Sequence, residues 1–99
     1  MRKKLVVGNW KMNGGLEQNA ALLSSLRQAE VVSGVDVAVC VPFPYLAQAQ
    51  QMLCESWLGW GAQDLNAQDS GAHTGEVSGG MLRDFSCRWV IVGHSERRA

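Results

Sequence analysis

The sequence predicts an α/β fold in which parallel strands alternate with helices in the order βαβαβαβ. The candidate strands are apolar runs without polar alternation, which is typical of strands buried on both faces of a parallel sheet. The segments between them are long enough for the crossover helices that parallel strands require. A hydrophobic fraction of 46% with 18% charged residues, over 99 residues, fits a globular domain with a substantial core.

The first strand is expected over residues 5–7, a short apolar run followed by Gly8, which permits a turn. From Leu16 onward, apolar residues recur at steps of three and four, which predicts a helix of roughly 14 residues. The stripe consists of Ala20, Leu23, Leu26 and then Ala29 or Glu30. We expect it to cover the sheet.

The second strand is expected over residues 35–41. It ends at Pro42, because proline cannot donate to the ladder hydrogen bonds of a sheet. Pro44 suits the first turn of a second helix. Helical spacing then continues to about residue 55, with apolar positions at Leu46, Ala49 and Leu53.

The third strand is expected over residues 57–63, although this run contains Gly59 and Gly61. A polar, glycine-containing loop follows from residue 64 to residue 75. A loop of this length between two elements is uncommon unless it has a function. We therefore expect the loop to be a functional element.

The last helix and strand are expected near the C-terminal end of the sequence. Ser78 has the side chain of an N-cap, and the brief helix behind it carries Met81, Leu82 and Phe85. Residues 89–92 are the strongest strand candidate of all. No linker divides the sequence, so residues 1–99 are expected to form one domain.

Composition and charge exclude several classes of protein. Nine basic residues balance nine acidic ones, so the net charge is +0 and no basic stripe is available for nucleic acid. Cys40, Cys54 and Cys87 are odd in number and form no C-x-x-C motif, which argues against a disulfide framework or a zinc site. The apolar stretches are too short for a signal peptide or a membrane span. We expect a cytoplasmic protein without a nucleic-acid or membrane partner.

Asn9 and Lys11 follow the first expected strand, two residues apart. Along an extended segment both side chains point to one side, where the Lys11 ammonium can neutralise a phosphate or a developing oxyanion. In parallel α/β folds, ligands gather at this end of the strands. Taken alone, however, Lys11 also fits a solvated loop residue, and Asn9 a turn former.

His94 follows the last expected strand, with Ser95 as a candidate helix cap. Glu96 would stand in the first helical turn, where the helix dipole favours a carboxylate. A helix N-terminus disfavours imidazolium, so His94 is expected to stay neutral and to donate a proton to a carbonyl oxygen. The spacing alone also fits a histidine bonded to a loop carbonyl.

A resemblance to a known family lies in two motifs, Gly8-Asn9-Trp10-Lys11-Met12-Asn13-Gly14 and Gly93-His94-Ser95-Glu96-Arg97-Arg98. They closely resemble the first and fourth strand-end signatures of the triosephosphate isomerase family. Residues 61–63, 71–78 and 81–82 resemble that family's third loop and the helix behind it. The resemblance covers essentially all 99 residues in order. At His73 the family more commonly carries Phe or Tyr.

The resemblance implies the N-terminal portion of a (β/α)₈ TIM barrel. It also implies an activity of glycolysis and gluconeogenesis, the interconversion of dihydroxyacetone phosphate and glyceraldehyde 3-phosphate through an enediol, without a cofactor or a metal. Lys11 would stabilise the negative charge of this phosphorylated triose and Asn9 would position it. His94 would polarise the carbonyl, the role of the neutral histidine in this family. Ser95 and Glu96 would support the site, Glu96 through Lys11.

The resemblance also implies that the site is incomplete. Such barrels run to about 250 residues, and here three βα units, a fourth strand and the start of its helix are expected. No glutamate of the sequence stands at the position of the family's general base, after the sixth strand. We therefore expect a truncated enzyme that is inactive in isolation. The alternative is a non-catalytic partial barrel that binds a phosphorylated ligand or pairs with a complementary chain.

A homodimer interface is the last expectation that follows from the resemblance. The family inserts its third loop into the partner subunit, so we expect the loop at residues 64–76 to be an interface element. Thr74 would reach the Asn9 and Lys11 region of the other subunit. Glu76 would pair with Arg97 across the same interface.

Overall fold

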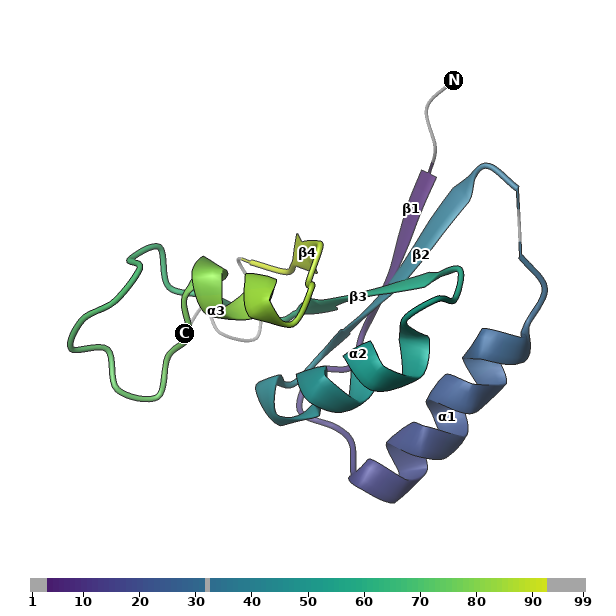
Figure 1. Cartoon of the computed structure of the whole chain (residues 1–99), viewed down its shortest axis with the longest axis horizontal. Coiled ribbons are helices and arrows are strands. Elements are labelled where there is room, and N and C mark those ends of the chain that lie inside the picture. The colour runs from purple at the N-terminus through teal and green to yellow at the C-terminus, as the bar shows by residue number, and fades with distance from the viewer. Residues whose placement is uncertain (1–3, 32, 93–99) are drawn as a thin grey trace.

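The computed structural model describes residues 4–31 and 33–92, and its four strands form one parallel sheet in the order β1-β2-β3-β4. The elements are β1 (Lys4–Asn9), α1 (Leu16–Gln28), β2 (Val35–Val41), the 3-10 turn η1 (Phe43–Tyr45), α2 (Leu46–Leu53), β3 (Leu58–Ala62), α3 (Gly79–Asp84) and β4 (Trp89–Val90). Parallel strands alternate with helices as a half-barrel (Figure 1). This arrangement confirms the predicted fold class and fits the first part of a TIM barrel.

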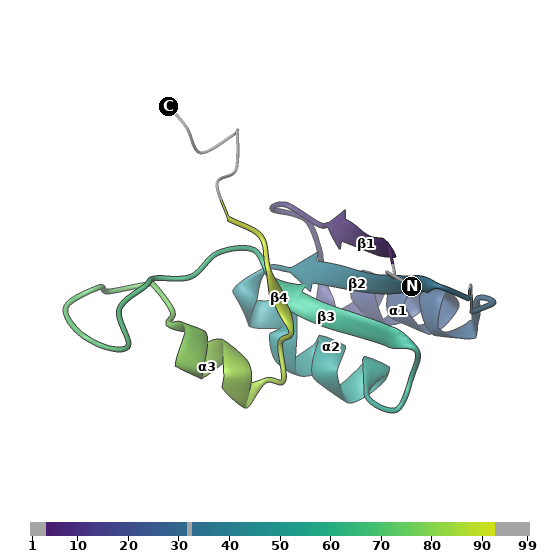
Figure 2. The same cartoon turned by 90° about the horizontal axis from the view of Figure 1, so that it is seen from above.

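The core lies between the sheet and its helices, which share one side of the sheet (Figure 2). It draws alternate residues from β2 and β3, as expected for strands whose side chains point to opposite faces. Its members are Leu23, Val39, Val41, Leu46, Ala49, Leu53, Leu58, Ala62 and Leu82. Burial of each large apolar side chain contributes about 1.5–3 kcal/mol to stability. The predicted stripe on α1 is confirmed at Leu23, which is 1% exposed.

The glycines of β3 have a packing reason that the sequence alone did not provide. A Cβ atom at Gly59 would clash with the indole ring of Trp89, and one at Gly61 would clash with the backbone of Trp89. The register Gly61↔Trp89 brings β4 against these positions. The absence of side chains therefore lets β4 approach β3.

Ser78 caps α3 as predicted, because its Oγ accepts a hydrogen bond from the Met81 N–H at 3.2 Å. The last strand is shorter than expected, since β4 contains only residues 89–90 of the predicted run 89–92. One further hydrogen bond, from the Ile91 N–H to the Ala62 carbonyl at 3.0 Å, continues the pairing with β3. No helix among residues 4–31 and 33–92 is long and apolar enough to cross a membrane.

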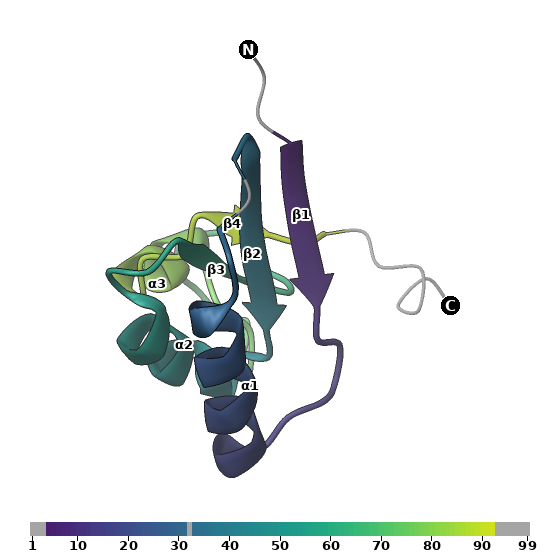
Figure 3. The same ribbon diagram turned by 90° about the vertical axis from the view of Figure 1, so that its right-hand side faces the viewer.

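The prediction that the first strand is buried is wrong. Every residue of β1 is exposed, including Leu5, Val6 and Val7 at 45%, 53% and 37%. β1 is the edge strand next to β2, and α1 packs mainly against α2 (Figure 3). The strand therefore has its predicted conformation, but no described element covers it.

Candidate active site

The candidate site lies at the carboxyl ends of β1, β2 and β3. Asn9 is the last residue of β1 and pairs in register with Cys40 of β2. Cys40 in turn pairs with Gly61 of β3, two residues before Gln63. Because the strands are parallel, these polar groups share one edge of the sheet. This is the edge where α/β folds bind ligands.

Gln63 connects the three strand ends through its side-chain amide. Its Nε2 donates to the carbonyl oxygen of Lys11 at 2.8 Å and to that of Cys40 at 3.1 Å. Asn9 Oδ1 lies 3.4 Å from the same nitrogen, a longer contact. The Cys40 carbonyl also accepts from the Trp10 N–H at 3.1 Å. The Gln63 amide thus fixes the start of the segment that carries Lys11.

Lys11 has a strained backbone, with φ of +54° in the left-handed region. Non-glycine residues seldom adopt this conformation, and it costs about 1 kcal/mol or more. The strain is held from both sides, because the Lys11 N–H donates to Asn9 Oδ1 at 2.8 Å and its carbonyl accepts from Gln63. Such strain persists where the surroundings over-determine it, and it clusters at functional sites.

The chemistry of this edge suits an anion. The exposed Lys11 offers an ammonium, and Asn9 offers the nitrogen of its side-chain amide, whereas the Gln63 amide already donates to the Lys11 and Cys40 carbonyls. An ammonium next to fixed amide dipoles can stabilise a phosphate or a developing oxyanion. Within residues 4–31 and 33–92, no group of three His, Cys, Asp or Glu side chains is placed to hold a metal ion.

Cys40 is part of this edge, in register with Asn9, and is fully buried. Desolvation by burial, with a smaller contribution from the charge of Cys87, raises the pKa of the Cys40 thiol to about 11. The thiol is therefore protonated at neutral pH. A protonated, inaccessible thiol is not a nucleophile, so we assign Cys40 a structural role.

The structure brings together only some of the predicted site residues. Asn9 and Lys11 are joined by the hydrogen bond from the Lys11 N–H to Asn9 Oδ1, but the backbone at Lys11 is left-handed and not extended as expected. His94, Ser95, Glu96 and Arg97 lie outside the described residues. Sequence reasoning missed the role of Gln63. The available signal was its place directly after a strand, at the same edge as Asn9 and Lys11.

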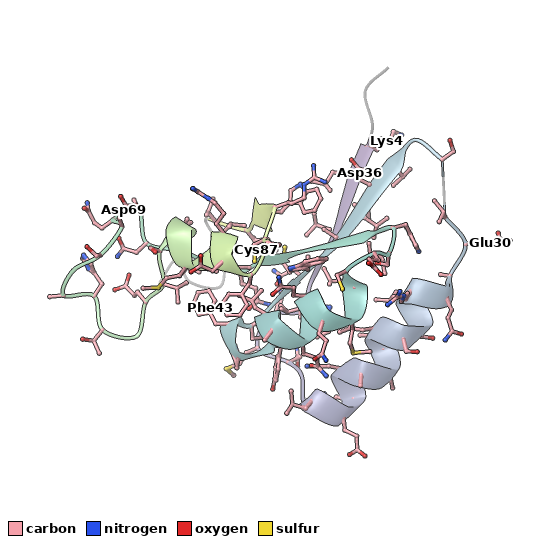
Figure 4. All side chains as sticks on the ribbon, in the orientation of Figure 1. Lys4, Glu30, Asp36, Phe43, Asp69 and Cys87 are labelled. Carbon is pink, nitrogen blue, oxygen red and sulfur yellow. The ribbon has the colours of Figure 1, made fainter. Side chains whose placement is uncertain are left out.

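The loop at residues 64–76 forms a separate feature that projects from the body of the molecule; Figure 4 shows Asp69 upon it. Thr74 and Glu76 are exposed there. Glu76 lines a hollow of about 270 Å³ on the loop, and its carboxylate accepts from the Asn66 amide at 2.8 Å. The Asn66 N–H also donates to the Val77 carbonyl at 2.7 Å, which closes the base of the loop.

The chain is similar to known proteins over nearly its whole length. The family model for triosephosphate isomerase matches residues 4–99. The triosephosphate isomerase of Thiobacillus denitrificans is 62% identical over 99 residues, which is 100% of this chain and 39% of the relative. That of Bordetella pertussis is 59% identical over 97 residues, 98% of this chain and 39% of the relative. That of Herminiimonas arsenicoxydans is 60% identical over 99 residues, with 100% and 40% covered. The chain therefore spans about two fifths of the length of these relatives.

Proposed function

Because this chain belongs to the triosephosphate isomerase family, we propose that it supplies the substrate-polarising part of a triosephosphate isomerase site. The reaction interconverts dihydroxyacetone phosphate and glyceraldehyde 3-phosphate through an enediol. One observation carries the proposal: the strained turn at Lys11, locked by Asn9 and Gln63 at the carboxyl edge of the sheet. A solvated surface lysine without a function would not need two hydrogen bonds to hold its backbone in a strained conformation.

In this proposal Lys11 neutralises the substrate's negative charge, and Asn9 orients the substrate and the turn. The Asn9–Lys11 hydrogen bond and the exposure of Lys11 support these roles, since the ammonium stays accessible while its backbone is fixed. Preorganised charge of this kind is usually the largest single contribution to such catalysis. No cofactor takes part.

His94 is the proposed electrophile, a neutral imidazole that donates to the substrate carbonyl as the enediolate forms. Ser95 would cap the helix behind it, and Glu96 would support the site through Lys11. These roles are carried over from the matching family motif, Gly93-His94-Ser95-Glu96-Arg97-Arg98.

The proposal includes the absence of activity in residues 1–99 alone. Proton abstraction needs a base within hydrogen-bond reach of the substrate carbon. The five glutamates of the sequence, Glu17, Glu30, Glu55, Glu76 and Glu96, do not match the family's base, which follows the sixth strand. The remaining part of the barrel would have to provide it.

The test is an isomerase assay on three samples. They are residues 1–99 alone, the C-terminal remainder of the Thiobacillus denitrificans relative alone, and a chimera in which residues 1–99 are continued by that remainder. We expect turnover from the chimera only. Turnover by residues 1–99 alone would contradict the assignment of the base. A folded chimera without turnover would contradict the proposed function.

The second candidate is a non-catalytic partial barrel that pairs with a complementary chain. The exposed edge strand β1 favours it, because Leu5, Val6 and Val7 offer an apolar strand with a free edge. The two separate parts, mixed at equal concentrations, discriminate the candidates. Complex formation without turnover favours the module, and turnover that appears only on mixing favours the enzyme.

A dimer completes the proposal. Thr74 would contact the Asn9 and Lys11 region of a second subunit, and Glu76 would pair with Arg97 across the same interface. The projection of the loop at residues 64–76 supports this, since both Thr74 and Glu76 are exposed on it. In the family this loop enters the partner subunit.

A further inference from the structure

Lys11 belongs to a segment, residues 10–15, that joins β1 to α1. Gln63 and Asn9 hold the start of this segment, as described above. The other end is Gly15, the residue before α1, which has no side chain to cap the helix. Something else must therefore fix this end if the position of Lys11 is to be defined.

Asn19, on the first turn of α1, provides that attachment. It is a polar residue only 2% exposed, and its Oδ1 accepts from the Gly15 N–H at 3.2 Å. Its Nδ2 donates to Gln48 Oε1 on α2 at 3.0 Å. The Gln48 Nε2 returns a hydrogen bond of 2.7 Å to the Leu16 carbonyl. Burial of an amide is costly unless its polar groups are paired, and here both ends of Asn19 have partners.

Close packing holds the segment at Gly14. At Gly14, φ is +139°, and a Cβ atom would lie 2.7 Å from the Tyr45 ring and 3.0 Å from Asn19 Oδ1. The segment also borders a hollow of about 310 Å³, lined by Trp10, Asn13, Gly14, Gln18, Asn19 and Leu22. No side chain fills this hollow among the described residues. The hydrogen bonds of Asn19 and Gln48 therefore keep the segment against Tyr45.

We propose that Asn19 and Gln48 are positioning residues for Lys11, an amide clamp between α1 and α2 that sets the end of residues 10–15. The catalytic consequence rests on the proposed function. The clamp uses Gln48 of α2, a helix that follows β2, to define where the ammonium stands. A displacement of about 1 Å from a site remote from the chemistry can cost as much as a hundredfold in rate.

The test uses the chimera with Asn19→Leu, Gln48→Met and both together. Each single variant removes one amide at similar volume, and we expect kcat/KM to fall about tenfold. The kcat/KM of the double variant should be no lower than that of the less active single variant, because the two amides act as one unit. The control is Leu23→Val, which loosens the core of α1 without touching the clamp. It should lower the melting temperature and leave kcat/KM unchanged.

A second readout does not depend on activity. Hydrogen exchange at the Gly15 and Lys11 amides should accelerate in Asn19→Leu and Gln48→Met, and not in Leu23→Val. In an active chimera, unchanged kcat/KM in both single variants overturns the proposal, whatever happens to stability. If the unsubstituted chimera is inactive, the proposed function fails and amide exchange decides alone: faster exchange at Lys11 supports the clamp, and unchanged exchange overturns it. If Asn19→Leu does not fold, the test relies on Gln48→Met, because Gln48 is only half-buried.

Discussion

Two polar segments leave the carboxyl edge of the sheet, and they are held in opposite ways. Residues 10–15, after β1, are bonded to β2, to Gln63 and to Asn19, so the body of the molecule defines their position. The loop at residues 64–76, after β3, is shaped by hydrogen bonds among its own residues, such as Asn66 to Glu76. The first segment is organised to present a charge. In the proposed dimer, the second is the segment that contacts the other subunit.

The largest effect should come from the charge on the organised segment. In the chimera, Lys11→Ala should lower kcat/KM about 10²- to 10³-fold, because the developing oxyanion loses its fixed counter-charge. The control is Lys4→Ala, an exposed lysine at the opposite end of β1. Steady-state kinetics of both variants give the comparison. Equal losses, or none, would mean that the Lys11 turn is not built for catalysis.

Substitutions in the loop at residues 64–76 should affect dimer formation more than catalysis. Thr74→Arg places a bulky charge on the proposed interface, and we expect monomers with reduced activity where the unsubstituted chimera is a dimer. Sedimentation velocity measures the change. Ser25→Arg adds the same charge to an exposed position of α1 and should leave the dimer intact. A dimer that survives Thr74→Arg would place the interface elsewhere.

Gln63→Leu tests whether the strained turn needs its lock. The variant removes the Gln63 donor from the Lys11 carbonyl, and the Cys40 carbonyl keeps only the Trp10 N–H, so the turn can relax from its left-handed conformation. We expect kcat/KM to fall about tenfold, and the double variant with Lys11→Ala to be no worse than Lys11→Ala alone. Gln51→Leu, on the exposed face of α2, is the control. An additive double variant would show that Gln63 acts on something other than Lys11.

Local patterns were sufficient for much of the fold. The apolar run at 35–41 became β2, and the capping role of Ser78 was confirmed. The burial of β1 could not be predicted, because Val6 and Val41 belong to similar apolar runs and differ only in what packs beside them. Whether a strand is buried depends on the elements that pack against it, and the residues of the strand alone do not determine those elements.

The candidate site divides in the same way. Asn9 and Lys11 could be predicted as candidates because they are close together in a motif at the end of a strand. Gln63 and Gln48 were not, because their bonds to Lys11 and Asn19 join residues 52 and 29 positions apart. These contacts depend on strand register and helix packing, and spacing along the chain does not determine either. The roles of His94 and Glu96 stay predictions.

The smallest expected effect is on the stability of the fold. It comes from the Cys40 thiol and appears only at alkaline pH. In the unfolded chain the Cys40 thiol ionises near its ordinary pKa of 9.0, whereas burial in the folded state raises its pKa to about 11. Because the folded pKa is raised, the stability contributed by the protonated thiol is complete below pH 9. It declines as the pH rises from 9 to about 11, by at most about 1.4 kcal/mol per pH unit.

Urea unfolding of the chimera at a series of pH values between 8 and 10.5 measures this decline. Cys40→Ala removes the titrating group, so the free energy of unfolding should fall less steeply with pH above 9 than in the unsubstituted protein. Cys54→Ala, which removes an exposed thiol, should leave the slope unchanged. Identical slopes in all three proteins would mean that the Cys40 thiol reaches water in the folded state. The packing around Cys40 would then be looser than the complete burial of this residue indicates.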